Sequence, residues 1–188
     1  MILIIDCGYK YINRLENLVY AYDDFQTVSV MDVLAQDMEE KQGLIITGTQ
    51  ISVHETNVDH YIEKFRIFLD SDLPILATGV GHHFVGISFG ALTAYQPYVN
   101  DLVEMSLLED DPLFAKLPSE INMMEDHAGT ISIPADFQLL ASSDLSINEA
   151  MRHKTKNIYG IQFLPELSGN QGAIVIENFV DISHNHKR

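Results

Sequence analysis

The sequence has few positively charged residues. Among 188 residues there are 11 lysines and arginines against 27 aspartates and glutamates, which gives a formal net charge of −16. Nucleic-acid backbones and anionic membrane surfaces both attract Lys and Arg, so we expect neither to be a partner. The charge favours a basic protein partner, and an acidic, solvated surface without a partner is the simpler interpretation beside it.

Cysteine and long apolar segments are equally scarce. The single cysteine, Cys7, cannot form an internal disulfide, which agrees with a reducing compartment. The opening run MILIID reaches an acid at Asp6 without a basic segment before it, and no later run approaches the roughly 18 apolar residues that span a bilayer. We therefore expect a cytoplasmic protein with no membrane contact.

The apolar residues that are present, 46% of the chain with Tyr and Cys included, predict one domain over residues 1–188. Short apolar runs alternate with segments of helical period at 2–6, 9–22, 27–31, 43–48, 60–70 and 74–79. Such alternation predicts an α/β fold with a mostly parallel sheet and helices on both faces.

The second half of the chain has a different pattern. After residue 90 the apolar runs are shorter, with turn signals between them, which predicts a small antiparallel extension. A buried strand is expected at 157–164 and a final helix at 172–182. The polar tail at 183–188 is expected to lie outside any element.

The stretch PILATGVGHHF (74–84) has the pattern of a catalytic turn without a catalytic residue. A strand, a Gly-x-Gly turn and a helix form the geometry with which α/β enzymes present a nucleophile. No Ser, Cys or Asp occupies the apex at Gly79. Thr78 and Ser88 lie nearby, but neither has a recognisable base, and we expect the Thr78 hydroxyl to bond local backbone.

The segment EAMRHKTKNIYGIQFLPE (149–166) is the most specific in the chain. It resembles the region leading to the His-Pro-Glu motif of class I glutamine amidotransferases, above all the glutaminase subunit of archaeal-type GMP synthases. Four other segments match that family in order: DCGYKYINR (6–14), LIITGT (44–49), PILATGVGHH (74–83) and EDH (125–127). The resemblance covers essentially the whole chain and implies a class I glutamine amidotransferase-like, flavodoxin-like fold.

The resemblance also assigns roles to three positions. In the family a Cys at the elbow attacks the glutamine side-chain amide, a His acts as general base, and a Glu orients the His. Carried over, these positions fall on Gly79, Leu164 and Glu166. We therefore predict that the usual triad is lost and that no catalytic residue of that set is intact. No cofactor is expected.

Several groups of the implied cleft remain as ligand-binding candidates: Gly48, Thr49, Gly81, His82, His83 and His127. His82, His83 and His127 with Glu166 also suggest a zinc or iron site, since imidazole and carboxylate suit both metals. Adjacent histidines on a helix diverge by about 100°, so at most one of the pair faces a given site. The prediction is that there is no metal site.

Three functional hypotheses follow. The first is a non-catalytic role in binding a synthetase subunit or a small-molecule ligand. The alternative is an amidohydrolase with altered chemistry that uses the cleft histidines or Cys7. Cys7 follows the first strand, so we expect it at the sheet edge where ligands of α/β folds gather. The third is a stand-alone structural or interaction protein, such as a homo-oligomer.

Overall fold

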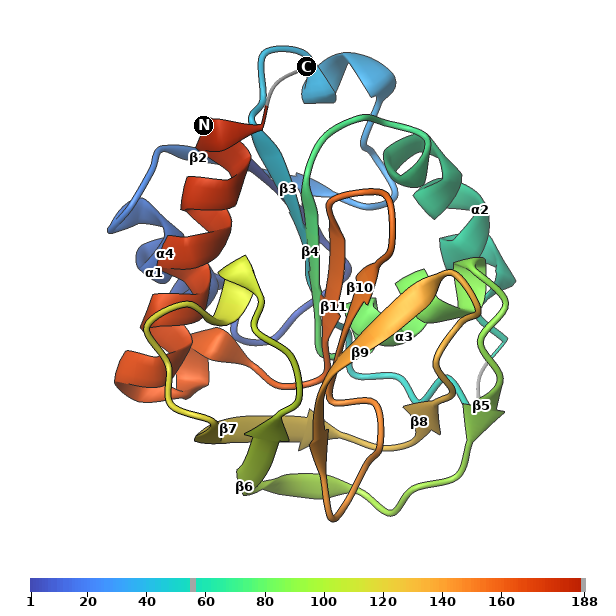
Figure 1. The fold of residues 1–188 in the computed structure, drawn as a ribbon. Coiled ribbons are helices and arrows are strands. Elements are labelled where there is room, and N and C mark those ends of the chain that lie inside the picture. Colours follow the sequence, from blue (N-terminus) through green and yellow to red (C-terminus); the bar gives the residue numbers. More distant parts are fainter. Residues whose placement is uncertain (55–56, 187–188) are drawn as a thin grey trace.

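The computed structural model describes residues 1–54 and 57–186, and a nine-stranded sheet forms its centre (Figure 1). The strand order is β2-β1-β3-β4-β11-β10-β9-β6-β7. The first five strands in this order pair in parallel. They are β2 (Phe25–Ser29), β1 (Ile2–Asp6), β3 (Gly43–Ile46), β4 (Ile75–Thr78) and β11 (Ile158–Ile161).

The antiparallel part extends the same sheet from β11. It comprises β10 (Ala150–His153), β9 (Phe137–Ser143), β6 (Val99–Leu107) and β7 (Glu120–His127). A separate two-stranded sheet pairs β5 (Thr93–Ala94) with β8 (Thr130–Ile131). Short 3-10 helices are η1 (Ala35–Met38), η2 (Pro112–Phe114) and η3 (Pro165–Leu167). The predicted α/β class and its antiparallel extension are confirmed.

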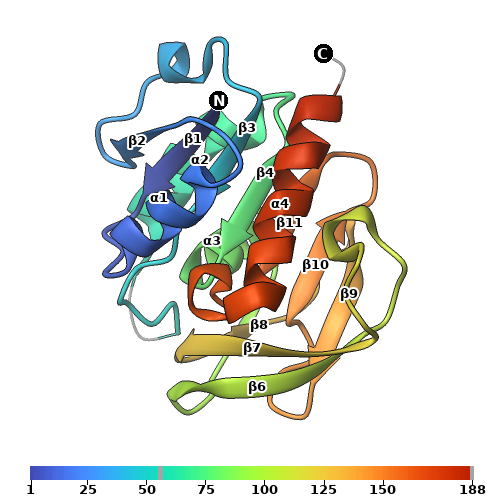
Figure 2. The same cartoon turned by 90° about the vertical axis from the view of Figure 1, so that its left-hand side faces the viewer.

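Two pairs of helices cover opposite faces of the parallel strands (Figure 2). α1 (Ile12–Tyr20) and α4 (Gly169–Asn185) pack on one face, and α2 (Asp59–Leu69) and α3 (Val80–Ser88) on the other. Successive residues of β1 point to different cores: Leu3 contributes to the core under α2 and α3, and Ile4 to the core under α1 and α4. This two-sided burial explains why the parallel strands read as continuous apolar runs.

Several elements differ from the predicted bounds. β11 runs from Ile158 to Ile161 within the predicted 157–164, and α1 from Ile12 to Tyr20 within 9–22. β2 runs from Phe25 to Ser29 rather than over 27–31, because it is an edge strand whose half-buried side chains give a weak apolar pattern. α4 begins at Gly169 and continues to Asn185, past the predicted end at 182. Ser183 is buried there and its hydroxyl donates to the Phe179 carbonyl, so the polar tail is helical to that point. In the described part of the chain, no helix is long and apolar enough to cross a membrane.

Candidate functional site

The elbow between β4 and α3 is built on glycines. Gly79 has φ 55° and ψ −128°, a left-handed backbone that glycine adopts without a Cβ clash. A Cβ at Gly81 would lie 2.7 Å from the carbonyl oxygens of Ile46 and Thr47. One at Gly48 would lie 2.9 Å from the backbone nitrogen that begins α3. The loop after β3 and the start of α3 therefore approach each other at backbone contact.

Leu164 lies directly beside the elbow. Its Cδ2 is 3.0 Å from the position that a Cβ at residue 79 would occupy, and its side chain is buried. The backbone nitrogen of Leu164 donates to the Met124 carbonyl at 2.8 Å, which fixes it against β7. The two positions that the resemblance assigns to a nucleophile and its base are thus neighbours, and both present only hydrogen or carbon.

Glu166 follows in η3 and turns its carboxylate toward the loop that precedes α1. The Tyr9 hydroxyl donates to Oε1, while Oε2 is buried without a hydrogen-bond partner among the described residues. Burial raises the pKa of Glu166 to about 7, although the hydrogen bond from Tyr9 acts in the opposite direction. Glu166 is therefore held by a tyrosine, and Leu164 gives it no ring to orient.

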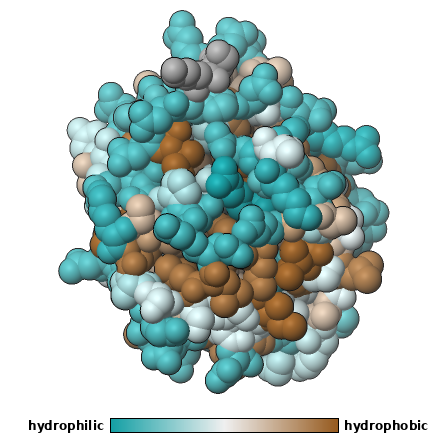
Figure 3. All heavy atoms as spheres, viewed as in Figure 1, coloured by the Kyte–Doolittle hydropathy of each residue, from teal (hydrophilic) through white to brown (hydrophobic). Residues whose placement is uncertain are grey.

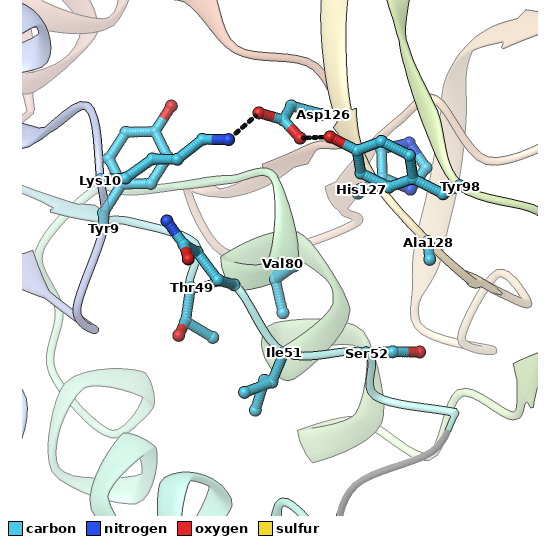
Figure 4. Close-up of a pocket in the computed structure, with 11 residues that line it drawn as sticks. Tyr9, Lys10, Thr49, Ile51, Ser52, Val80, Tyr98, Asp126, His127 and Ala128 are labelled. Carbon is cyan, nitrogen blue, oxygen red and sulfur yellow. Dashed lines mark hydrogen bonds and ion pairs between the residues drawn. The ribbon is translucent and has the colours of Figure 1, made fainter.

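A cavity of about 330 Å³ opens next to the elbow (Figure 4). Its lining comes from the loop after β1, the loop after β3, the start of α3, the segment before β6 and the end of β7. The lining residues are Tyr9, Lys10, Thr49, Gln50, Ile51, Ser52, Val80, Tyr98, Asp126, His127 and Ala128. The volume suits a small molecule of metabolite size.

Asp126 is the polar centre of this cavity. Lys10 Nζ lies 2.6 Å from Oδ2, and the Tyr98 hydroxyl donates to Oδ1 at 2.6 Å from the other side (Figure 4). Partial burial acts against ionisation, but the hydrogen bonds from Lys10 and Tyr98 lower the pKa of Asp126 below its usual value. The cavity mouth thus has a fixed cation, a fixed anion and exposed phenol oxygen.

A buried polar network lies behind the cavity. His127 Nε2 is 3.0 Å from Glu125 Oε2, and its Nδ1 is 3.1 Å from the Gly129 carbonyl. Because a carbonyl only accepts, Nδ1 carries a hydrogen, and a proton must also lie between Nε2 and Glu125. The His83 ring packs edge-on against His127, with centroids 5.7 Å apart.

The network continues from His83 to a second carboxyl group. His83 Nε2 is 2.9 Å from Gln162 Oε1, and Gln162 Nε2 donates to Glu149 Oε2 at 3.2 Å. Burial first, then the Glu125 charge and the hydrogen bond with Glu125, raise the pKa of Glu149 to about 9. Burial lowers the pKa of His83 to about 4. At neutral pH this network therefore holds Glu149 as an acid and His83 as a neutral ring.

The structure separates the adjacent histidines that the sequence groups together. His82 is fully buried, and its ring lies against the backbone of Asn148 and Gly160. Its Nδ1 lies 2.5 Å from where a Cβ of Gly160 would stand, so it faces β11 rather than the cavity. Of the predicted ligand-binding residues, Thr49 and His127 line the cavity. Gly48, Gly81 and His83 shape or support it from behind.

Lys10, Tyr98 and Asp126 are cavity residues that the sequence reasoning did not single out. Lys10 follows the first strand by four residues, so the rule that ligands gather at strand ends could have included it with Cys7. Asp126 lies within the EDH segment. No group of three or more His, Cys, Asp or Glu among residues 1–54 and 57–186 is arranged to hold a metal ion.

Cys7 is placed as a core residue. It is 4% exposed, and burial, reinforced by the charge of Asp6, raises the pKa of its thiol well above the usual range. We expect a thiol reagent such as 5,5′-dithiobis-(2-nitrobenzoate) to react at pH 8 on the order of 100-fold more slowly with the native chain than with the urea-unfolded chain. Equal absorbance time courses in the two states would contradict this placement.

Comparisons with known proteins agree with the fold. A family model described as Glutamine amidotransferase class-I matches residues 3–182. The chain belongs to this class I glutamine amidotransferase family. A glutamine-hydrolyzing GMP synthase subunit of Methanobrevibacter smithii is 31% identical over 189 residues, 96% of this chain and 95% of that protein. The corresponding subunit of Pyrococcus furiosus is 29% identical, and the match covers 97% of this chain and 98% of that protein.

Solved structures give the same result. A Thermoplasma acidophilum protein provisionally described as a GMP synthase subunit superposes with a TM-score of 0.89 at 27% identity, covering 97% of this chain and 93% of that one. A glutamine amidotransferase from Thermotoga maritima has a TM-score of 0.74 at 15% identity over 96% of this chain and 82% of that one, which supports the fold. The chain is thus similar to glutamine-hydrolyzing GMP synthase subunits over nearly its full length.

Proposed function

We propose that this chain is a glutamine amidotransferase-like subunit that binds a synthetase partner and does not hydrolyse glutamine through a cysteine triad. The observation that carries the proposal is the glycine apex at Gly79 with the Leu164 side chain packed against it. Attack on an amide needs a nucleophile and a base within hydrogen-bond reach. Neither position supplies either group.

The cavity supports a second role, in which the same chain binds a small polar ligand. Lys10 and Asp126 provide opposite charges at its mouth, and the lining remains open beside Leu164. A ligand held there would contact the loop after β3 and the end of β7. This role needs no reactive group, so it is compatible with the lost triad.

The alternative hydrolase receives less support from the contacts. Cys7 is buried with a raised pKa, and the Leu164 side chain occupies the space from which a base would act. His83 is committed to Gln162, and His82 faces the core. A buried thiol without a neighbouring base or an opening to solvent is a poor nucleophile.

Ammonia release from glutamine tests the proposal. We expect the purified chain to release no more ammonia than its Cys7→Ser variant, measured by coupled glutamate dehydrogenase over hours at pH 7.5. A Gly79→Cys/Leu164→His double variant, which restores the two lost groups, is the positive comparison. If the parent hydrolyses glutamine and the Cys7→Ser variant does not, Cys7 is a relocated nucleophile, and the proposal that the chain has lost glutaminase activity is rejected.

A further inference from the structure

The charge of the chain is unevenly distributed along the sequence. Residues 67–151 contain 13 of the 27 acidic residues and one of the 11 basic residues, Lys116. Lys116 lies on the other side of the molecule in an ion pair with Glu177 of α4. Nine of the 13 acids are exposed, whereas Asp111, Glu125 and Glu149 are buried, so residues 67–151 present an acidic surface with few cations of its own. Arg152 of β10 lies just beyond this range and pairs with Asp111.

The same part of the chain also exposes large apolar side chains. Leu92 is 75% exposed and Ile147 is 70% exposed, with Tyr95 and Tyr98 above 60%. Figure 3 shows apolar residues gathered in the lower half of this face, where Figure 1 places β8 and the turn between β9 and β10. We define the apolar strip by six exposed side chains of this part of the chain: Leu92, Tyr95, Tyr98, Ile133, Leu145 and Ile147.

Hydrogen bonds between neighbouring residues hold the strip together. Leu92 and Ser132 exchange two bonds, the Leu92 nitrogen with the Ser132 hydroxyl at 3.0 Å and the Ser132 nitrogen with the Leu92 carbonyl at 2.9 Å. The Asn148 amide donates to the Ser132 carbonyl at 3.4 Å, which brings the 144–148 turn against β8. The segments that carry Leu92, Ile133 and Ile147 are therefore joined to one another by hydrogen bonds.

One end of the strip is the cavity mouth. Tyr98 lines the cavity and donates to Asp126, and the Tyr95 ring packs against His54 of the loop after β3 at 6.0 Å between centroids. A molecule seated on the strip would therefore also cover the opening beside the elbow. Exposed tyrosines next to aliphatic side chains are typical of the residues that dominate binding energy in protein interfaces.

We propose that the apolar strip is the docking surface for a synthetase subunit whose matching face carries lysine and arginine around an apolar centre. This inference rests on the proposed function. An apolar patch in an acidic surround selects a partner that buries the patch and supplies the missing cations. A second copy of the chain is disfavoured, because it would bring a second acidic surface, with the same formal net charge of −16, against the first.

The test is binding of the purified synthetase subunit of GMP synthase from the same organism, measured by biolayer interferometry. We expect the parent to bind, and a Leu92→Lys/Ile147→Lys variant to bind at least about tenfold more weakly, because it removes apolar contact and adds like charge. The matched control is Met31→Lys/Leu34→Lys, two exposed apolar residues that lie outside the apolar strip, in the segment between β2 and η1. It should bind as the parent does, and all variants should unfold at similar temperatures.

The outcomes separate the two proposals. Equal binding by the parent and the strip variant overturns the docking surface and leaves the partner role in place. No binding by the parent rejects the partner role itself. Sedimentation velocity tests the other occupant. If the parent forms concentration-dependent dimers and the strip variant does not, the strip binds a second copy of the chain, and the proposal of a basic synthetase partner on this surface is overturned. Parent binding that weakens as NaCl rises from about 0.05 to about 0.5 M supports the basic face.

Discussion

As the pH rises, the Glu149→Gln variant should become increasingly stable relative to the parent, because the parent loses stability with rising pH. Folding raises the pKa of Glu149 to about 9, from a value near 4.5 when the side chain is exposed. Between these values the folded chain holds a proton that the unfolded chain has released. The free energy of unfolding of the parent therefore falls with rising pH, by up to about 1.4 kcal/mol per pH unit.

Glutamine reproduces the protonated side chain without the titration. Its oxygen can accept from the Ser143 hydroxyl, which lies 2.5 Å from Glu149 Oε1, and its amide can face Glu125. The amide cannot accept the hydrogen bond that Gln162 Nε2 donates to Glu149 Oε2, but the loss of that bond lowers stability equally at every pH and leaves the slope unchanged. Urea unfolding of both proteins at pH 5.5, 7 and 8.5 measures the difference. The lowered pKa of His83 gives the parent the opposite slope at acid pH, but it is present in both proteins and cancels.

The matched control is Glu104→Gln, a change of the same chemistry at an exposed position on β6. Its stability should follow the pH dependence of the parent. If the curves of the parent and Glu149→Gln run parallel from pH 5.5 to 8.5, Glu149 does not hold in the folded chain a proton that it releases on unfolding. The difference in stability between Glu149→Gln and the parent should already grow below pH 8, because the unfolded chain releases its Glu149 proton near pH 4.5. A difference that grows only above pH 8 would contradict this.

Replacing Gly172 by Ala should cost the fold about 3 kcal/mol, the upper end of typical overpacking penalties. A Cβ at this position would lie 2.0 Å from the Pro165 carbonyl oxygen and 2.7 Å from its carbonyl carbon. Both are backbone atoms, so a rotamer change cannot relieve the clash. α4 or η3 must move, and η3 carries Glu166 next to Leu164.

The midpoint of urea unfolding, followed by circular dichroism, checks this prediction. Asn170→Ala, an exposed change in the first turn of the same helix, controls for the better helix propensity of alanine. It should leave stability within about 0.5 kcal/mol of the parent. A Gly172→Ala protein as stable as that control would mean that α4 packs less closely on η3.

The parallel half of the fold could be predicted because its pattern is local. Strands buried on both faces are continuous apolar runs, and α1 and α2 have apolar residues at spacings of three and four. The edge strand β2 was displaced by two residues, since its half-buried face gives little signal. α4 was predicted too short because the hydrogen bond of Ser183 and its burial depend on packing and leave no apolar period.

The candidate site divides in the same way. The sequence alone determined that positions 79 and 164 carry no reactive group, since side-chain identity requires no coordinates. The tertiary structure decided where the remaining polar groups point. Glu125, Glu149 and Gln162 lie on segments far apart in the chain, and only the pairing of β10 with β11 and the placement of β7 bring them to one buried network.

The two adjacent histidines show the physical reason. His82 and His83 are equivalent in sequence, but the start of α3 turns one ring toward Gly160, where a missing side chain leaves room, and the other toward Gln162. The sequence therefore determined the family, the parallel core and the absence of a reactive side chain at positions 79 and 164. Which polar groups are buried, which titrate and which surface is exposed depend on contacts between distant segments, and only the tertiary structure decided them.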